Sequence, residues 1–75
     1  MENLELAKQL MNQALQLAIQ SNDNVCLGCA YRGLGEIYCA KGEEILAKQY
    51  FQNAREAFEK ANDKIAVQEI NQLLK

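Results

Sequence analysis

The chain has 75 residues, a formal net charge of −2 and no histidine. This length allows one domain at most, and the charge excludes the cationic surface that nucleic-acid binding requires. No apolar run approaches the ~20 residues that span a bilayer, and the acidic N-terminus lacks the apolar core of a signal peptide. We therefore expect a cytoplasmic protein that contacts neither nucleic acid nor membrane.

Helix-forming residues dominate the composition. Proline is absent, while Ala, Leu, Gln, Glu and Lys are frequent, and all five favour helices. Apolar residues recur with the 3.6-residue period of amphipathic helices in four segments. The sequence therefore predicts one all-α domain over residues 1–75, with helices at about 3–20, 24–41, 43–61 and 64–74.

The first two predicted helices each carry a broad apolar face. The first face consists of Leu4, Ala7, Leu10, Met11, Ala14, Leu17 and Ala18. The segment "SNDN" then breaks the pattern, and Asp23 is a candidate N-cap for the second helix. The second face consists of Leu27, Ala30, Tyr31, Leu34, Ile37 and Tyr38. Gly42 follows this helix, as glycine often does just past a helix C-terminus.

The last two predicted helices continue the same organisation. The third helix has Ala47, Tyr50, Phe51, Ala54, Phe58 and Ala61 on one face. The segment "NDK" ends it, with Asp63 as a second candidate N-cap. The fourth helix carries Ile65, Val67, Ile70, Leu73 and Leu74 up to the end of the chain.

An internal repeat emerges when the sequence is shifted by 40 residues. The segment that starts at Ala7, "AKQLMNQALQLAIQSNDNV", then falls on "AKQYFQNAREAFEKANDKI", which starts at Ala47. Six of nineteen positions are identical, and the apolar positions are kept. This similarity predicts a unit of two helices that repeats about every 40 residues. A plain four-helix bundle with a fortuitous repeat is the alternative, and in it the first and fourth helices would touch.

The central unit resembles the tetratricopeptide repeat, an antiparallel helix pair, in a longer variant of about 40 residues. Gly42 matches the turn of that family, and Glu59 stands where the family usually has proline. The resemblance implies an α-solenoid fragment, an array of antiparallel helix-turn-helix units. The residues that match the family's packing positions are Tyr31, Leu34, Gly35, Tyr38, Ala47, Phe51 and Ala54.

Small residues explain why this packing tolerates glycine within helices. Gly35, Ala47 and Ala54 let helix axes approach closely, which can offset the propensity cost of glycine, about 1 kcal/mol. If Gly35 and Ala54 faced open solvent, this interpretation would be wrong. Gly33 has no place in the family pattern, and we expect it at an exposed position.

The resemblance also implies function, because most family members bind peptides or protein segments in a groove lined by their first helices. The matching groove positions are Cys29, Arg32, Glu36 and Cys39. A clamp for a terminal carboxylate is not expected, since Glu36 replaces a needed asparagine. Arg32 and Glu36 also have the i, i+4 spacing of an ordinary surface ion pair. We expect a protein-protein interaction or scaffolding module.

The ends of such an array leave apolar surface uncovered, because a solenoid needs polar capping helices and usually three or more repeats. We expect a homodimer in which end helices of two copies complete each other's core. The candidate self-association residues are Ile65, Val67, Ile70, Leu73 and Leu74. The alternative is that further repeats of a longer array cover these ends.

Three cysteines, Cys26, Cys29 and Cys39, leave a second functional class open. An odd number argues against a closed disulfide framework, and a zinc site would need further ligands. A thiol-based redox sensor or metal-binding protein is therefore the alternative to a scaffold. We expect no enzymatic activity, no metal and no cofactor, because the cysteines lack a histidine base and the paired glutamates lie in solvated segments.

Overall fold

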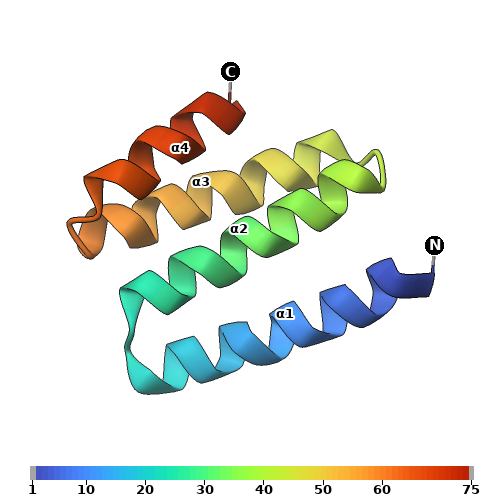
Figure 1. Cartoon of the computed structure of the whole chain (residues 1–75), viewed down its shortest axis with the longest axis horizontal. Coiled ribbons are helices and arrows are strands. Elements are labelled where there is room, and N and C mark those ends of the chain that lie inside the picture. Colours follow the sequence, from blue (N-terminus) through green and yellow to red (C-terminus); the bar gives the residue numbers. More distant parts are fainter. Residues whose placement is uncertain (1, 75) are drawn as a thin grey trace.

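Residues 2–74 form four antiparallel α-helices joined by short turns in the computed structural model (Figure 1), which describes side chains for residues 4–74. The helices are α1 (Glu2–Ser21), α2 (Asn24–Ala40), α3 (Glu44–Lys60) and α4 (Lys64–Leu74). The all-α fold expected from the helical periodicity is confirmed, and each helix begins and ends within one residue of its predicted bounds. None of the helices in this described part is long and apolar enough to cross a bilayer.

All three turns have the same construction. Asn22, Gly42 and Asn62 each adopt a positive φ, at 60°, 82° and 60°. The next backbone N–H returns to the preceding helix, as from Asp23 to the carbonyl of Ala18 at 3.2 Å. This is the Schellman pattern, in which a left-handed residue satisfies the last carbonyl groups of a helix. Glycine and asparagine fit because they enter that conformation most readily.

The repeated Asn-Asp pair therefore has a physical role. After the left-handed asparagine, the Asp23 carboxylate accepts hydrogen bonds from the backbone N–H groups of Val25 and Cys26, at 3.0 and 3.2 Å. Asp63 accepts one from Ala66 at 3.1 Å. These bonds satisfy the first free donors of α2 and α4. The middle turn lacks the aspartate, and Glu43 at the start of α3 makes no such side-chain bond.

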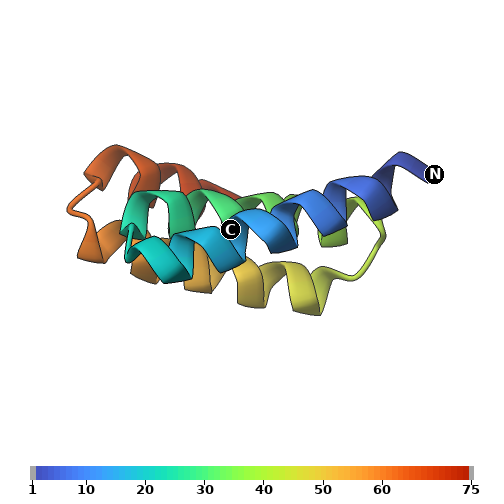
Figure 2. The ribbon, with the colours of Figure 1, turned by 90° about the horizontal axis from the view of Figure 1, so that it is seen from below.

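The helices lie in an open row, with α1 and α4 on opposite sides of the central α2–α3 pair (Figure 1). The layer is shallow, measuring 35 × 30 × 16 Å between Cα atoms, as the edge-on view illustrates (Figure 2). This arrangement is the expected helical hairpin array and not a closed bundle. Two details differ from the array as we expected it, in which α1 and α4 would each pack on both central helices. Helix α1 packs mainly on α2, and α4 packs mainly on α3.

Two glycines of α2 receive two phenylalanine rings of α3. A Cβ atom added at Gly35 would lie 2.7 Å from the Phe51 ring, and one added at Gly28 would lie 2.7 Å from the Phe58 ring. The two glycines are seven residues apart along α2, and the two phenylalanines are seven residues apart along α3. The glycines thus set the close approach of α2 and α3, and Gly28 was not foreseen in this role.

Gly33 is not at an exposed position, so that expectation is wrong. It is half-buried and faces α1, where an added Cβ atom would run into the sulfur of Met11. The Met11 side chain crosses α2 at this point. Gly33 therefore serves the α1–α2 contact, while Gly28 and Gly35 serve the α2–α3 contact.

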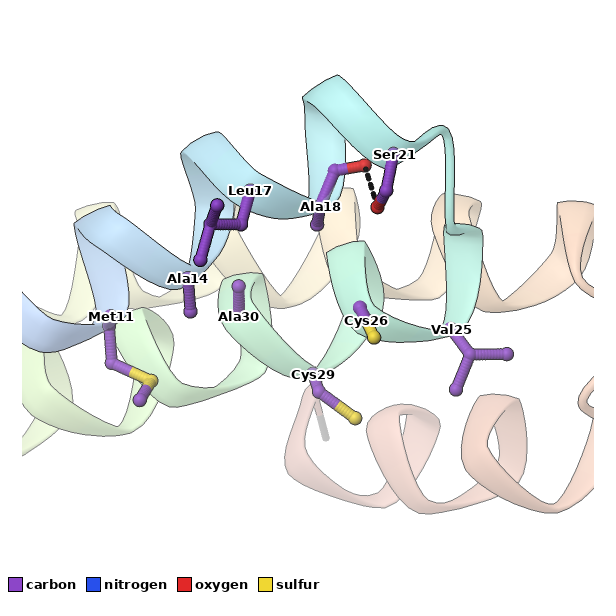
Figure 3. Close-up of a pocket in the computed structure, with 9 residues that line it drawn as sticks. All are labelled: Met11, Ala14, Leu17, Ala18, Ser21, Val25, Cys26, Cys29 and Ala30. Carbon is purple, nitrogen blue, oxygen red and sulfur yellow. Dashed lines mark hydrogen bonds between the residues drawn. The ribbon is translucent and has the colours of Figure 1, made fainter.

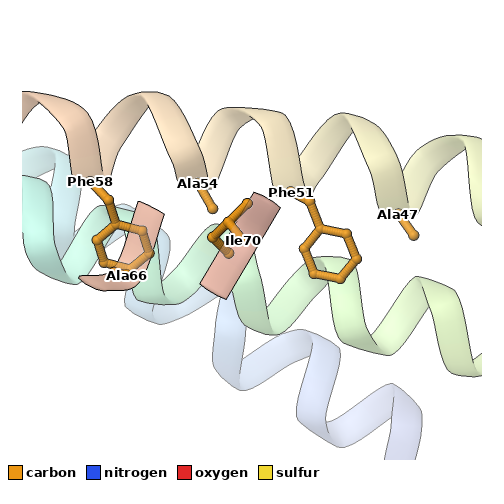
Figure 4. Packing of buried hydrophobic residues seen from close by; sticks show 6 residues of the cluster. All are labelled: Ala47, Phe51, Ala54, Phe58, Ala66 and Ile70. Carbon is orange, nitrogen blue, oxygen red and sulfur yellow. The ribbon is translucent and has the colours of Figure 1, made fainter. Parts of the chain in front are cut away.

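The principal core lies between α3 and α4 and comprises Ala47, Phe51, Ala54, Phe58, Ala66 and Ile70 (Figure 4). Ala54 and Ile70 are fully buried. Tyr31, Tyr38, Val67 and Leu74 pack against this cluster while remaining partly exposed. Gly35 and Ala54 therefore lie in helix contacts and not in open solvent, as the packing interpretation requires.

Candidate partner-binding surface

The four predicted groove residues lie on the accessible side of α2, but an ion-pair network occupies its middle. Arg32 Nη1 donates to Glu69 Oε1 of α4 at 3.1 Å, and Arg32 Nε lies 3.5 Å from Glu36 Oε1. All three side chains are substantially exposed, so these pairs add little stability. Arg32 is thus engaged within the chain, and Cys29 and Cys39 lie on either side of it, exposed.

The two outer groove positions open onto different hollows. Cys29 lines a hollow between α1 and α2, whereas Cys39 lines a smaller one with α3 and α4. Ten residues separate them along α2, a distance of about 15 Å at 1.5 Å per residue. The two outer residues of the predicted groove therefore border two separate hollows on one helix.

A stripe of uncovered leucines runs along α1. Leu6, Leu10 and Leu17 are 57%, 52% and 65% exposed. Their spacing of four and seven residues places them on one side of the helix. Leu10 and Leu17 were expected inside the apolar face of α1, but α2 covers only part of that broad face. Sequence periodicity identifies an apolar face and does not say how much of it a neighbour covers.

An apolar hollow with a volume of about 480 Å³ adjoins this stripe (Figure 3). We call it the α1–α2 hollow. Its lining is almost wholly apolar and contains small side chains from both helices. The lining residues are Met11, Ala14, Leu17, Ala18, Ser21, Val25, Cys26, Cys29 and Ala30. No pattern within a single helix predicts this hollow, and only a comparison of the two repeat copies in the folded chain locates it.

The surroundings of Cys26 do not activate its thiol. The hydrogen bond of Cys26 Sγ to Asp23, at 3.2 Å, together with the negative charge of that carboxylate, raises the pKa of the Cys26 thiol. A reactive cysteine needs the opposite environment, which favours the thiolate. Within residues 2–74, no three potential metal ligands of the Cys, Asp and Glu type gather in one place.

The candidate self-association residues of α4 differ in how far their side chains are exposed. Ile65 is 73% exposed and Leu73 is 44% exposed, so both present apolar surface. Val67 and Leu74 pack partly against the core, and Ile70 is fully buried within the chain. Ile70 therefore has no surface to offer a second copy. Ala66 takes the inward place expected for Ile65, because Ala66 and Ile70 lie one turn apart on the side facing α3.

The sequence matches no protein-family model, no curated protein and no solved structure with which it was compared.

Proposed function

We propose that the chain is a protein-interaction module of the tetratricopeptide type, which binds a helix or peptide of a partner protein through its open helix faces. The observation that carries this proposal is the uncovered apolar surface of α1 beside the α1–α2 hollow. Contiguous exposed apolar surface on a small protein is typical of interaction sites. The open row of helices and the resemblance of the central pair to that repeat family support the same proposal.

Differential capture tests this function. We expect wild-type chain, used as bait, to retain partner proteins that a Leu10→Glu/Leu17→Glu variant does not, because the charges would be desolvated at the interface. Ile45→Glu is the matched control, since Ile45 is 77% exposed on another helix. Equal capture by all three baits would show that the α1 face has no part in binding.

Self-association is the second part of the proposal. The exposed leucines of α1 allow two copies to cover each other weakly when no partner is present. We expect sedimentation equilibrium to detect reversible dimers at tens of micromolar, a range typical of weak interfaces, and Leu10→Glu to abolish them. A chain that stays monomeric at all concentrations would remove self-association and leave the capture test untouched.

The thiol-based alternative has one observation in its favour, namely that Cys26 and Cys29 both line the α1–α2 hollow. The raised pKa of Cys26 disfavours it. Replacing all three cysteines by serine separates the two functions. A scaffold keeps its partner under oxidising and reducing conditions, whereas a sensor loses its redox response.

A further inference from the structure

The two repeat copies place α1 and α2 in correspondence with α3 and α4, forty residues later. In the second copy, helix α2 is seated beside α3 and α4. Phe58 of α3 presses its ring on Gly28, and Glu69 of α4 pairs with Arg32. Subtracting 40 gives the matching residues of the first copy, Ala18 and Cys29. Both line the α1–α2 hollow. The hollow therefore corresponds, in the first copy, to the surface of α3 and α4 on which α2 packs in the second.

Two substitutions between the copies make this place deeper in the first copy. Phe58 and Ile70 are nearly or fully buried in the second copy, and their counterparts are Ala18 and Ala30. Ala14, at the same hollow, corresponds to Ala54 and is unchanged. The first copy thus keeps the helix arrangement but lacks the two large side chains that fill the second one.

We propose that the α1–α2 hollow is the binding site of an amphipathic helix from a partner protein, which lies on α1 as α2 lies on α3. This inference rests on the proposed interaction function and specifies its ligand. The partner helix carries a large apolar side chain, such as phenylalanine or leucine, at the position where α2 carries Gly28. That side chain takes the volume which Ala18 and Ala30 leave open.

The surroundings of the hollow define the partner's polarity as well. Where the second copy has the carboxylate of Glu69 to pair with Arg32, the first has Cys29, which offers no carboxylate. A cation at the Arg32 position of the partner helix would therefore find no counter-charge. Gln9, Gln13 and Gln20, beside the leucine stripe, are exposed and uncharged. An uncharged, apolar helix face fits this site.

Helix α4 of a second copy does not fit the same site. Forty residues after Gly28 and Tyr31 stand Gln68 and Asn71, so α4 would bring two amide side chains to the apolar hollow. Burying them there without partners is unfavourable. Asn71 is also engaged within its own chain, accepting a hydrogen bond from Arg55 at 3.0 Å. The polarity of α4 therefore favours a separate partner helix.

Two synthetic peptides test the proposal directly. Both contain residues 23–41 with serine in place of the three cysteines and glutamine in place of Arg32, and they differ in one substitution. The test peptide carries Gly28→Phe, and the control carries Gly33→Phe, which has the same composition but the ring on another side. The Gly28→Phe peptide cannot replace α2 in its own place, because Phe58 blocks a larger residue there. We expect it to bind the intact chain at least about tenfold more tightly than the control, in line with burial of one phenylalanine.

A variant of the chain in which larger side chains fill the hollow provides a second test. Ala18→Phe/Ala30→Ile copies the side chains of the second repeat into the first. We expect binding of the Gly28→Phe peptide to fall at least about tenfold, and circular dichroism to show helicity unchanged. The peptide comparison on wild-type chain does not depend on this variant. Equal binding of the two peptides, or unchanged binding to a folded Ala18→Phe/Ala30→Ile chain, would overturn the proposal.

Alkylation and sedimentation identify the occupant. We expect the Gly28→Phe peptide to slow iodoacetamide labelling of Cys29, which lines the hollow, and to leave Cys39, which does not, unchanged. Uniform labelling would contradict the site. A stable wild-type dimer at 1 µM that Ala18→Phe/Ala30→Ile abolishes would make a second copy the occupant and refute a separate partner. The function itself fails only if the capture test in addition shows no dependence on Leu10 and Leu17.

Discussion

At the scale of single residues, three glycines of α2 show that one residue type can serve different contacts. Gly28 and Gly35 face rigid phenylalanine rings of α3, and Gly33 faces the flexible side chain of Met11. Each glycine weakens the helix by about 1 kcal/mol relative to alanine. Packing against the rings compensates this cost at the first two positions, because no Cβ atom would fit there.

Alanine substitutions separate these contributions. We expect Gly28→Ala and Gly35→Ala each to lower the free energy of unfolding by about 1–3 kcal/mol, the usual cost of overpacking. Gly33→Ala serves as the internal control and should be nearly neutral, since the Met11 side chain can move aside. Urea denaturation measures all three. If Gly35→Ala instead stabilised the chain by the helix-propensity gain alone, the close contact with Phe51 would be wrong.

The same residues indicate how much the sequence could predict. The resemblance to the repeat family and the small size of Gly35 and Ala54 placed both in helix contacts, where the structure has them. The role of Gly28, the inward position of Gly33 and the exposure of Leu10 could not be foreseen. Periodicity describes one helix at a time, whereas these properties depend on which neighbour approaches each side of that helix.

At the scale of the helices, the turns are the most regular feature. The Asn-Asp pair combines a left-handed residue that ends one helix with a carboxylate that begins the next. The backbone N–H and the thiol of Cys26, together with the backbone N–H of Val25, donate to the Asp23 carboxylate and lower its pKa below the ordinary value. A carboxyl group whose pKa is lowered in the folded state stabilises that state when ionised.

This linkage predicts a pH dependence that belongs to the start of α2. The Asp23 contribution is complete above the unfolded pKa, about 3.9, and is lost as the pH falls through the lower folded value. Asp23→Asn keeps a hydrogen-bond acceptor but cannot titrate. We therefore expect wild type to have the higher melting temperature at pH 6, and the difference to shrink toward pH 3. A difference that stays constant over this range would mean that the Asp23 charge does not stabilise α2.

The candidate site also belongs to this scale, and the sequence predicted only its outer edge. Cys29 was selected from the family pattern and does line the α1–α2 hollow. The absence of two large side chains, at Ala18 and Ala30, deepens the hollow. Alanine is an ordinary helix residue, so neither position attracts notice until the folded copies are compared.

At the scale of the whole molecule, the row gives the central helices more neighbours than the outer helices. The central helices α2 and α3 each pack on two others, and α1 packs mainly on α2. In α1, Ala18 is the described side chain that is nearly fully buried. Stability should therefore decrease from the centre of the row to α1, since local opening follows the density of buried contacts.

Amide hydrogen exchange measures this gradient. We expect the slowest exchange in α2 and α3 and the fastest in α1, with α1 opening before global unfolding. The Gly28→Phe peptide, if it binds as proposed, should slow exchange in α1 most. Uniform protection across the four helices would mean that the row unfolds as a single cooperative unit.

The shared turns have a consequence for how such a molecule can lengthen. Residues 23–62 start with the aspartate of one Asn-Asp turn and finish with the asparagine of the next, and both turns have a left-handed asparagine and the same backbone hydrogen bonds. A tandem duplication of the genetic segment encoding this block would join like to like and insert a further hairpin without disturbing the flanking helices. Growth by whole blocks is therefore easy for this architecture, whereas insertion of an arbitrary number of residues would break a helix.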